Sequence, residues 1–169
     1  VAHGLLVDHT LPRKIAGGGG HAVYGAHGAA LELTAAWVVD NFATGIAVDK
    51  SALVADRSVV RLTRFAHLID PDRRQMKVAL GDALLGVQAT GFEVRRSSVT
   101  DNQRAGLLLD GTPTAVLSAS LVAHGTFGVV TQNGSVVTAK GNLVFGHAQQ
   151  NRAGDGGLAV PAPPVLVGK

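Results

Sequence analysis

Hydrophobic and polar residues alternate along much of this chain with a period of two, which is the period of a β-strand. The alternation is clearest between Thr112 and His147, where short valine- and leucine-rich runs are separated by turn residues. Asn133-Gly134 lies between two such runs and predicts a hairpin turn, because both central residues of a type I′ turn need a positive φ. This part of the sequence therefore predicts a β-built module.

The same pattern predicts further short strands upstream, and a polar loop at residues 97–103. The expected strands cover Gly4–Val7, Ile46–Val48, Ser58–Phe65, Gln75–Leu80, Gly86–Val94 and Leu107–Leu109. Asp70-Pro71-Asp72 breaks the series, and we identify no strict internal repeat. About eight to ten short antiparallel strands favour a single-domain β-barrel or β-sandwich with at most one helix.

The segment from Ala29 to Phe42 fits two structures. A helix would place one apolar stripe on a single side, formed by Leu31, Ala35, Val38 and Phe42. A strand would place a different apolar set on one face, formed by Leu31, Leu33, Ala35, Trp37 and Val39. The pattern alone leaves both alternatives open.

Composition indicates one domain with flexible ends. The chain has 169 residues, of which 46% are hydrophobic and only 4% aromatic, so its core is built mainly of small aliphatic side chains. We expect an N-terminal arm and glycine-rich loop at residues 1–28, a β module at 29–150 and an extended C-terminal tail at 151–169. A thin core of this kind often gains stability from partner subunits, so we expect a homo-oligomer.

The sequence offers no catalytic, cofactor-binding or metal-ligating residues, and no cofactor is expected. The chain has no cysteine, which excludes disulfides, cysteine-ligated zinc and thiol catalysis. Gly17 to Gly20 is followed by His21, so the cation of a phosphate-binding loop is missing. His3 and His9 are six residues apart and would lie about 20 Å apart on a strand, too far to share a metal.

Charge and hydropathy give no reason to expect nucleic-acid or membrane partners. The net charge is +3 and the sequence pI is about 9.7. The basic residues between Arg57 and Lys77 alternate with Asp56, Asp70 and Asp72, which favours a solvated face or a subunit contact. No apolar run reaches the length of a membrane-spanning helix, so we expect a protein that is soluble before assembly.

Several segments resemble the small β-built decoration, or cement, proteins of tailed-phage capsids. They are Gly4-Leu-Leu-Val-Asp8, the Gly- and His-containing stretch to His27, Leu33-Thr-Ala35, Gly45-Ile-Ala-Val-Asp49, Thr138 to Gly146 and Val165-Leu-Val-Gly168. The resemblance implies a virion structural protein on the capsid surface, which bridges neighbouring capsid subunits and contacts copies of itself. In that role the ends, Val1 to Gly20 and Asn151 to Lys169, would make the contacts. A major capsid or tail-tube protein is an alternative of the same class.

The chain also resembles hotdog-fold acyl-thioester enzymes. His27-Gly28 would open the central helix, and Asp110-Gly111 with Ala123 to Phe127 would resemble the last strands. This resemblance implies an acyl-CoA or acyl-carrier thioesterase or dehydratase, with Glu32 as the acid and His27 or His9 as its partner. It departs from the family at Ala36, where an acidic residue is usual, and it requires a helix over residues 29–42.

Overall fold

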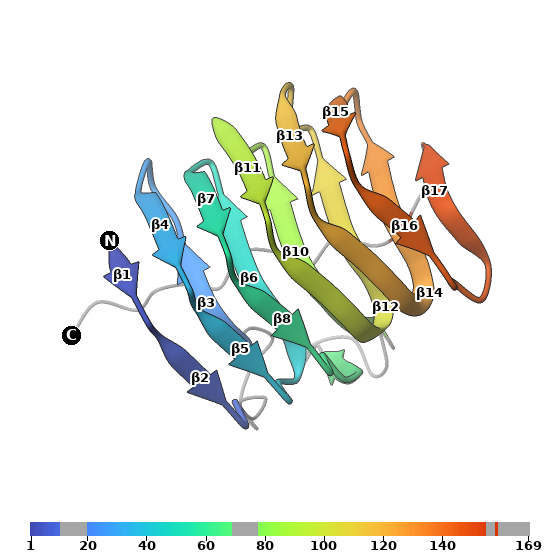
Figure 1. Cartoon of the computed structure of the whole chain (residues 1–169), viewed down its shortest axis with the longest axis horizontal. Coiled ribbons are helices and arrows are strands. Elements are labelled where there is room, and N and C mark those ends of the chain that lie inside the picture. The colour runs from blue at the N-terminus through green and yellow to red at the C-terminus, as the bar shows by residue number, and fades with distance from the viewer. Residues whose placement is uncertain (11–19, 69–77, 155–157, 159–169) are drawn as a thin grey trace.

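The computed structural model of the chain describes residues 1–10, 20–68, 78–154 and 158. These residues form seventeen strands and no helix. Paired strands run parallel to one another, except that β9 (Ala66–Leu68) pairs antiparallel with β10. The strands are stacked along one axis, with β1 at one end and β17 at the other (Figure 1).

Each turn of the chain contributes to three faces, as a coil does. The first face consists of β1 (Ala2–His3), β4 (Ala30–Thr34), β7 (Ala52–Asp56), β11 (Gly91–Arg95), β13 (Ala115–Ser118) and β15 (Val137–Lys140). The second consists of β2 (Leu6–Asp8), β5 (Trp37–Val39), β8 (Val59–Arg61), the first residues of β12 (Ser98–Asp110) and β14 (Leu121–Gln132), and β16 (Leu143–Phe145). The third consists of β3 (His21–Gly25), β6 (Ala43–Asp49), β10 (Val78–Val87), the later residues of β12 and β14, and β17 (Gln150–Gly154). This arrangement is a parallel β-helix.

One valine from each turn forms a ladder inside the second face. The register pairs neighbouring members of the ladder directly: Val7, Val38, Val60, Val99, Val122 and Val144. The four central valines are buried in the main core. A β-branched side chain packs well on a pleated sheet, so a valine repeated at this position stabilises every turn in the same way.

The ladder exposes an internal repeat that our sequence analysis missed. Val38 to Val60 is a step of 22 residues, Val99 to Val122 one of 23, and Val122 to Val144 again one of 22. The steps before Val38 and before Val99 are longer because the chain carries extra residues between β2 and β3 and between β8 and β10. The repeat length is constant only once these insertions are removed, and they concealed it.

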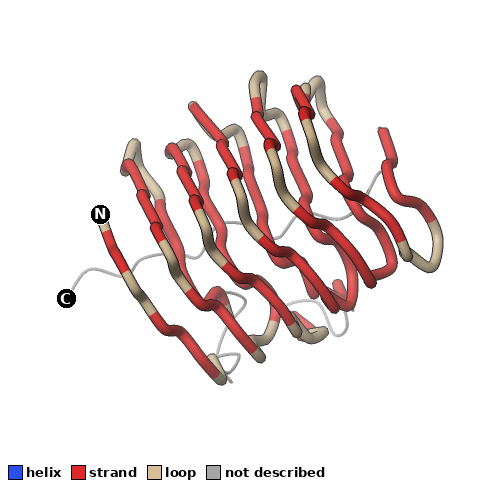
Figure 2. The backbone as a smooth tube through the Cα atoms, in the orientation of Figure 1, coloured by secondary structure: helices blue, strands red, loops and turns tan. Residues whose placement is uncertain are grey.

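The chain changes direction at each corner through a residue with positive φ. Between the first and second faces these residues are Gly4, Ala35, Arg57, Arg96, Ala119 and Gly141, with φ between +47° and +64°. These corner residues fall between the strand bounds, in the short loops that Figure 2 colours tan. For a non-glycine residue this conformation costs about 1 kcal/mol, so the neighbouring contacts must stabilise it.

Hydrogen bonds between successive turns provide that stabilisation. At this corner the backbone N–H of Ser58 donates to Ser97 Oγ at 3.1 Å, and the N–H of Ser97 donates to Ser120 Oγ at 3.1 Å. The N–H of Ser120 donates in turn to Asn142 Oδ1 at 2.9 Å. Each Ser or Asn follows a positive-φ residue, so the corner both turns the chain and joins it to the next turn.

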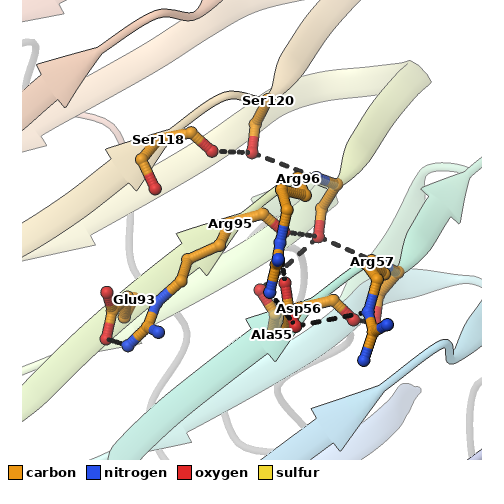
Figure 3. A network of polar contacts seen from close by, with 10 residues as sticks. Ala55, Asp56, Arg57, Glu93, Arg95, Arg96, Ser118 and Ser120 are labelled. Atoms are coloured by element: carbon orange, nitrogen blue, oxygen red, sulfur yellow. Dashed lines mark hydrogen bonds and ion pairs between the residues drawn. The ribbon is translucent and has the colours of Figure 1, made fainter.

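Ion pairs lie on the outside of the same corner (Figure 3). The Arg96 guanidinium donates to both carboxylate oxygens of Asp56, at 2.8 and 2.6 Å. This contact holds the pKa of the Asp56 carboxyl below its usual value. Because the Arg96 side chain is exposed, the contribution of this ion pair to stability is small compared with that of the serine ladder.

The observed topology corrects the fold expected from the sequence. The protein is mainly β, but the short strands form a parallel coil and not an antiparallel barrel or sandwich. Asn133 and Gly134 both have positive φ, as a hairpin turn requires, yet they form a corner between β14 and β15. β14 pairs with β12, and β15 pairs with β13. Of residues 97–103, expected as a polar loop, residues 98–103 form the start of β12.

The segment from Ala29 to Phe42 contains two strands, β4 and β5, so strand and not helix is confirmed. The expected single apolar face is wrong, because the corner at Ala35 leaves Leu33 buried inside the coil and Trp37 exposed outside it. The helix that the acyl-thioester interpretation requires is therefore absent from this segment. In the region expected as an N-terminal arm and loop with one strand at Gly4–Val7, residues 2–3, 6–8 and 21–25 form the three strands of the first turn. The expected terminal strand Val165–Gly168 and the break at Asp70–Asp72 lie outside the described residues.

Candidate interaction surface

The outward side of the first face is mainly polar or charged. One outward row contains Thr34, Asp56, Arg95, Ser118 and Lys140, which are paired by the strand register. The neighbouring row contains Glu32, Val54, Glu93, Val116 and Thr138, of which Val116 is an exposed large apolar residue. This face has the composition of a solvated surface.

The outward side of the third face is apolar but covered. Ala47, Leu85, Leu108 and Val130 form a cluster separate from the main core, and all four are buried. Leu158 packs against this cluster. Gln132 Nε2 donates a hydrogen bond to the backbone carbonyl of Leu158 at 2.9 Å, and the backbone N–H of Leu158 donates to Gln132 Oε1 at 3.1 Å. Leu158 thus docks on this face.

The outward side of the second face is apolar and exposed. Its principal row, which we call the apolar stripe, runs through Leu6, Trp37, Val59, Ser98, Leu121 and Leu143, one residue from each turn. Leu6, Trp37 and Leu143 are 68%, 54% and 66% exposed. Five of the six members are apolar, and none carries a charge. Val59, Ser98 and Leu121 are partly buried, so the most exposed apolar side chains lie towards the two ends of the stripe. Exposed apolar side chains grouped on one face mark interaction sites.

A second outward row lies beside the apolar stripe, two residues further along each strand. It runs through Asp8, Val39, Arg61, Thr100, Ala123 and Phe145. Phe145 is 46% exposed and contacts the edge of the His124 ring, which is a corner residue. This second row carries only two charged side chains, so the second face as a whole remains mainly apolar.

A buried polar cluster lies on the third face next to the chain insertions. Asp82 is fully buried, and the Arg104 guanidinium binds both of its carboxylate oxygens, with Nε at 2.8 Å from Oδ1. Burial raises the pKa of the Asp82 carboxyl, and the Arg104 guanidinium opposes that shift. The strand register places Thr44 beside Asp82 and His21 beside Thr44.

His21 is held neutral by its surroundings. Its ring stacks on Tyr24 with centroids 5.2 Å apart, and its buried Nδ1 has no hydrogen-bond partner. Burial lowers the pKa of His21 to about 4. The folded protein therefore binds fewer protons than the unfolded chain between about pH 4 and the ordinary histidine pKa of about 6.5.

We expect this difference to make stability depend on pH. The free energy of unfolding should fall by about 2 kcal/mol between pH 7 and pH 5, because protonation of His21 in the unfolded state favours unfolding. Denaturant titrations at both pH values should show this loss for the wild type and for His3→Gln, which changes an exposed histidine. His21→Gln should lose the dependence. An unchanged dependence in His21→Gln would contradict the assignment.

An open cavity of about 320 Å³ lies at the last turn, between β15 and β17. Its lining includes Leu117, Val129 and Val137 from the inner side of the coil, together with Arg152. Arg152 pairs in register with the core residue Val129 but is itself exposed, so the inner row of the coil ends in a charged residue at the last turn. The cavity lies between the first and third faces and does not adjoin the stripe.

The structure does not bring together the residues of the acyl-thioester interpretation. His27 lies at a corner with a φ of +58°, and Glu32 lies exposed on the first face. His9 instead lies between two carboxylates, with Nδ1 2.7 Å from Asp8 and Nε2 2.9 Å from Asp40. Among the described residues, no hydrogen bond or ion pair joins Glu32 to either histidine.

The described part of the chain contains no cluster of three or more His, Asp or Glu side chains that could hold a metal ion. It also contains no helix long and apolar enough to cross a membrane. In comparisons with protein-family models, curated proteins and solved structures, nothing matches the chain. The apolar stripe is therefore the candidate functional feature that the geometry supports best, and the sequence analysis did not identify it.

Proposed function

We propose that this protein is a structural protein that works as a multimer and joins its neighbours through the apolar stripe. The observation that carries the proposal is the contrast between the three faces. The first face is polar, and the third is apolar but covered at Leu158. The second presents Leu6, Trp37 and Leu143 to solvent. Burying such side chains contributes about 25 cal/mol per Å² of apolar surface.

The repeating architecture suits this role. Parallel pairing along the coil holds the stripe residues at the strand spacing of about 4.8 Å, so the surface is rigid and pre-organised. A rigid partner loses little conformational entropy when it binds. The particle that the sequence resemblance suggests is a virion, in which the protein would decorate the capsid surface, and that assignment remains part of the proposal.

The proposal predicts that Trp37→Lys disrupts self-association. A lysine at this position of the stripe would place a charge in an apolar contact, and loss of a tryptophan anchor typically costs about 2 kcal/mol or more. The dissociation constant should therefore rise by at least about 30-fold. Sedimentation velocity over a range of concentrations measures this change.

Val116→Lys is the matched control, because Val116 is an exposed valine on the first face. It should sediment like the wild type. A wild-type protein that stays monomeric at every accessible concentration would contradict self-association. Equal weakening by both substitutions would contradict the assignment of the contact to the second face.

A further inference from the structure

We infer that the occupant of the apolar stripe is the stripe of a second copy. The two copies pack face to face about a two-fold axis, with their coil axes antiparallel; we call this the antiparallel dimer. This inference rests on the proposed function and names the partner and its register. The axis would run along the strand direction and cross the stripe midway between β8 and β12. These are the two central strands of the stripe.

The order of residues along the stripe supports this arrangement. A two-fold axis at its centre places Leu6 opposite Leu143 of the second copy, and Trp37 opposite Leu121 of the second copy. Val59 then lies opposite Ser98 of the second copy, so that the one polar member is placed at the centre. The largest and most exposed side chains thus meet apolar partners throughout. An isologous contact of this kind closes after two copies.

The second row distinguishes this arrangement from its parallel alternative. In the antiparallel dimer the row also meets itself, so that Arg61 lies opposite the Thr100 hydroxyl of the second copy and Asp8 lies opposite Phe145 of the second copy. In a parallel dimer whose axis lies between the two rows, each stripe would pack on the second row of the other copy. Leu6 would then cover Asp8, and Val59 would cover Arg61. Covering a charge with an apolar side chain costs free energy unless the charge is paired. The antiparallel dimer has one such contact in each copy and this parallel dimer has two, so the antiparallel dimer is favoured over it.

Both arrangements can be tested by chemical cross-linking because the natural chain has no cysteine. Single-cysteine variants Leu6→Cys and Leu143→Cys keep Trp37 in place. In the antiparallel dimer, the thiol at residue 6 of one copy faces the thiol at residue 143 of the other across packed sheets about 10 Å apart. The two thiols at residue 6, one from each copy, are in addition five strand spacings of about 4.8 Å apart along the coil, or about 24 Å, and so are the two thiols at residue 143. A bismaleimide linker of about 10 Å should join the two variants to each other.

The expected result is a cross-linked dimer in a mixture of the two variants and little in either variant alone. The parallel dimer predicts the opposite, since each variant would link to itself. A mixture of His3→Cys and Lys140→Cys controls for end-to-end contact, because these residues lie on the first and last strands of the first face. That mixture should not cross-link above background.

The outcomes separate this inference from the proposed function. If the wild type sediments as a multimer but the variants link to themselves, or only the His3 and Lys140 variants link, the antiparallel inference is wrong and self-association stands. If the wild type sediments as a monomer and no pair cross-links, both are wrong. If the Leu6 and Leu143 variants link only to each other, both are supported.

Discussion

Val99→Asp is expected to prevent the chain from folding. Val99 lies inside the coil with 0% exposure, between Val60 and Val122 of the valine ladder. A carboxylate there would have to be buried without a partner or be protonated, and either costs several kcal/mol. That cost is comparable to the whole stability of a domain, about 5–15 kcal/mol. Circular dichroism should show loss of the β signal at 25 °C.

Two further variants make this prediction quantitative. Val99→Ala removes the same contacts without adding a charge and should lower the free energy of unfolding by about 2 kcal/mol. Thr100→Asp places the same carboxylate on the outward side of the same strand and should change stability by less than about 0.5 kcal/mol. Equal destabilisation at residues 99 and 100 would contradict the inside–outside assignment of β12.

Asp82→Ala is expected to cost about 3–5 kcal/mol. The substitution removes the carboxylate that binds the Arg104 guanidinium, and a buried charge that loses its partner is strongly destabilising. Denaturant titration at pH 7 measures the loss. Replacing both residues, as Asp82→Ala with Arg104→Met, should recover most of it, because the pair is replaced by apolar groups.

The double variant separates two explanations. If the double variant is as unstable as Asp82→Ala, the lost free energy of unfolding comes from other contacts of these two side chains and not from their ion pair. If Asp82→Ala stays within about 1 kcal/mol of the wild type, the carboxylate is not held in a buried ion pair at all.

The sequence predicted the strands better than their arrangement. The alternation of apolar and polar residues has the same period in parallel and antiparallel strands, so it identified β structure without the pairing. Asn133-Gly134 illustrates the limit. Positive φ at both residues fits a hairpin and also fits the corner observed between β14 and β15. The choice between them depends on contacts with turns more than twenty residues away.

The corners were also difficult to predict because most of them use residues other than glycine. Ala35, Arg57 and Arg96 adopt positive φ although nothing in their side chains favours it. The signal that could have revealed them is the residue that follows, since Ser58, Ser97, Ser120 and Asn142 each precede an outward residue and then a ladder valine. Read as a motif, this pattern recurs at the repeat length.

The apolar stripe was hidden for a related reason. Its six members lie far apart in the sequence, and the repeat that aligns them was not recognised. Each exposed apolar residue considered singly is ordinary on a protein surface. Trp37 and Leu143 form one surface only after the coil has brought their strands into a single sheet.

The most direct test of the account is the fluorescence of Trp37, which is the only tryptophan in the chain and lies in the middle of the stripe's N-terminal half. We predict that its emission maximum shifts to shorter wavelength, and that quenching by iodide falls, as the wild-type protein is concentrated through its association range. Both changes should be lost in Leu143→Lys, which alters the far end of the stripe. An emission maximum and quenching constant that stay those of an exposed indole while the protein assembles would contradict the account.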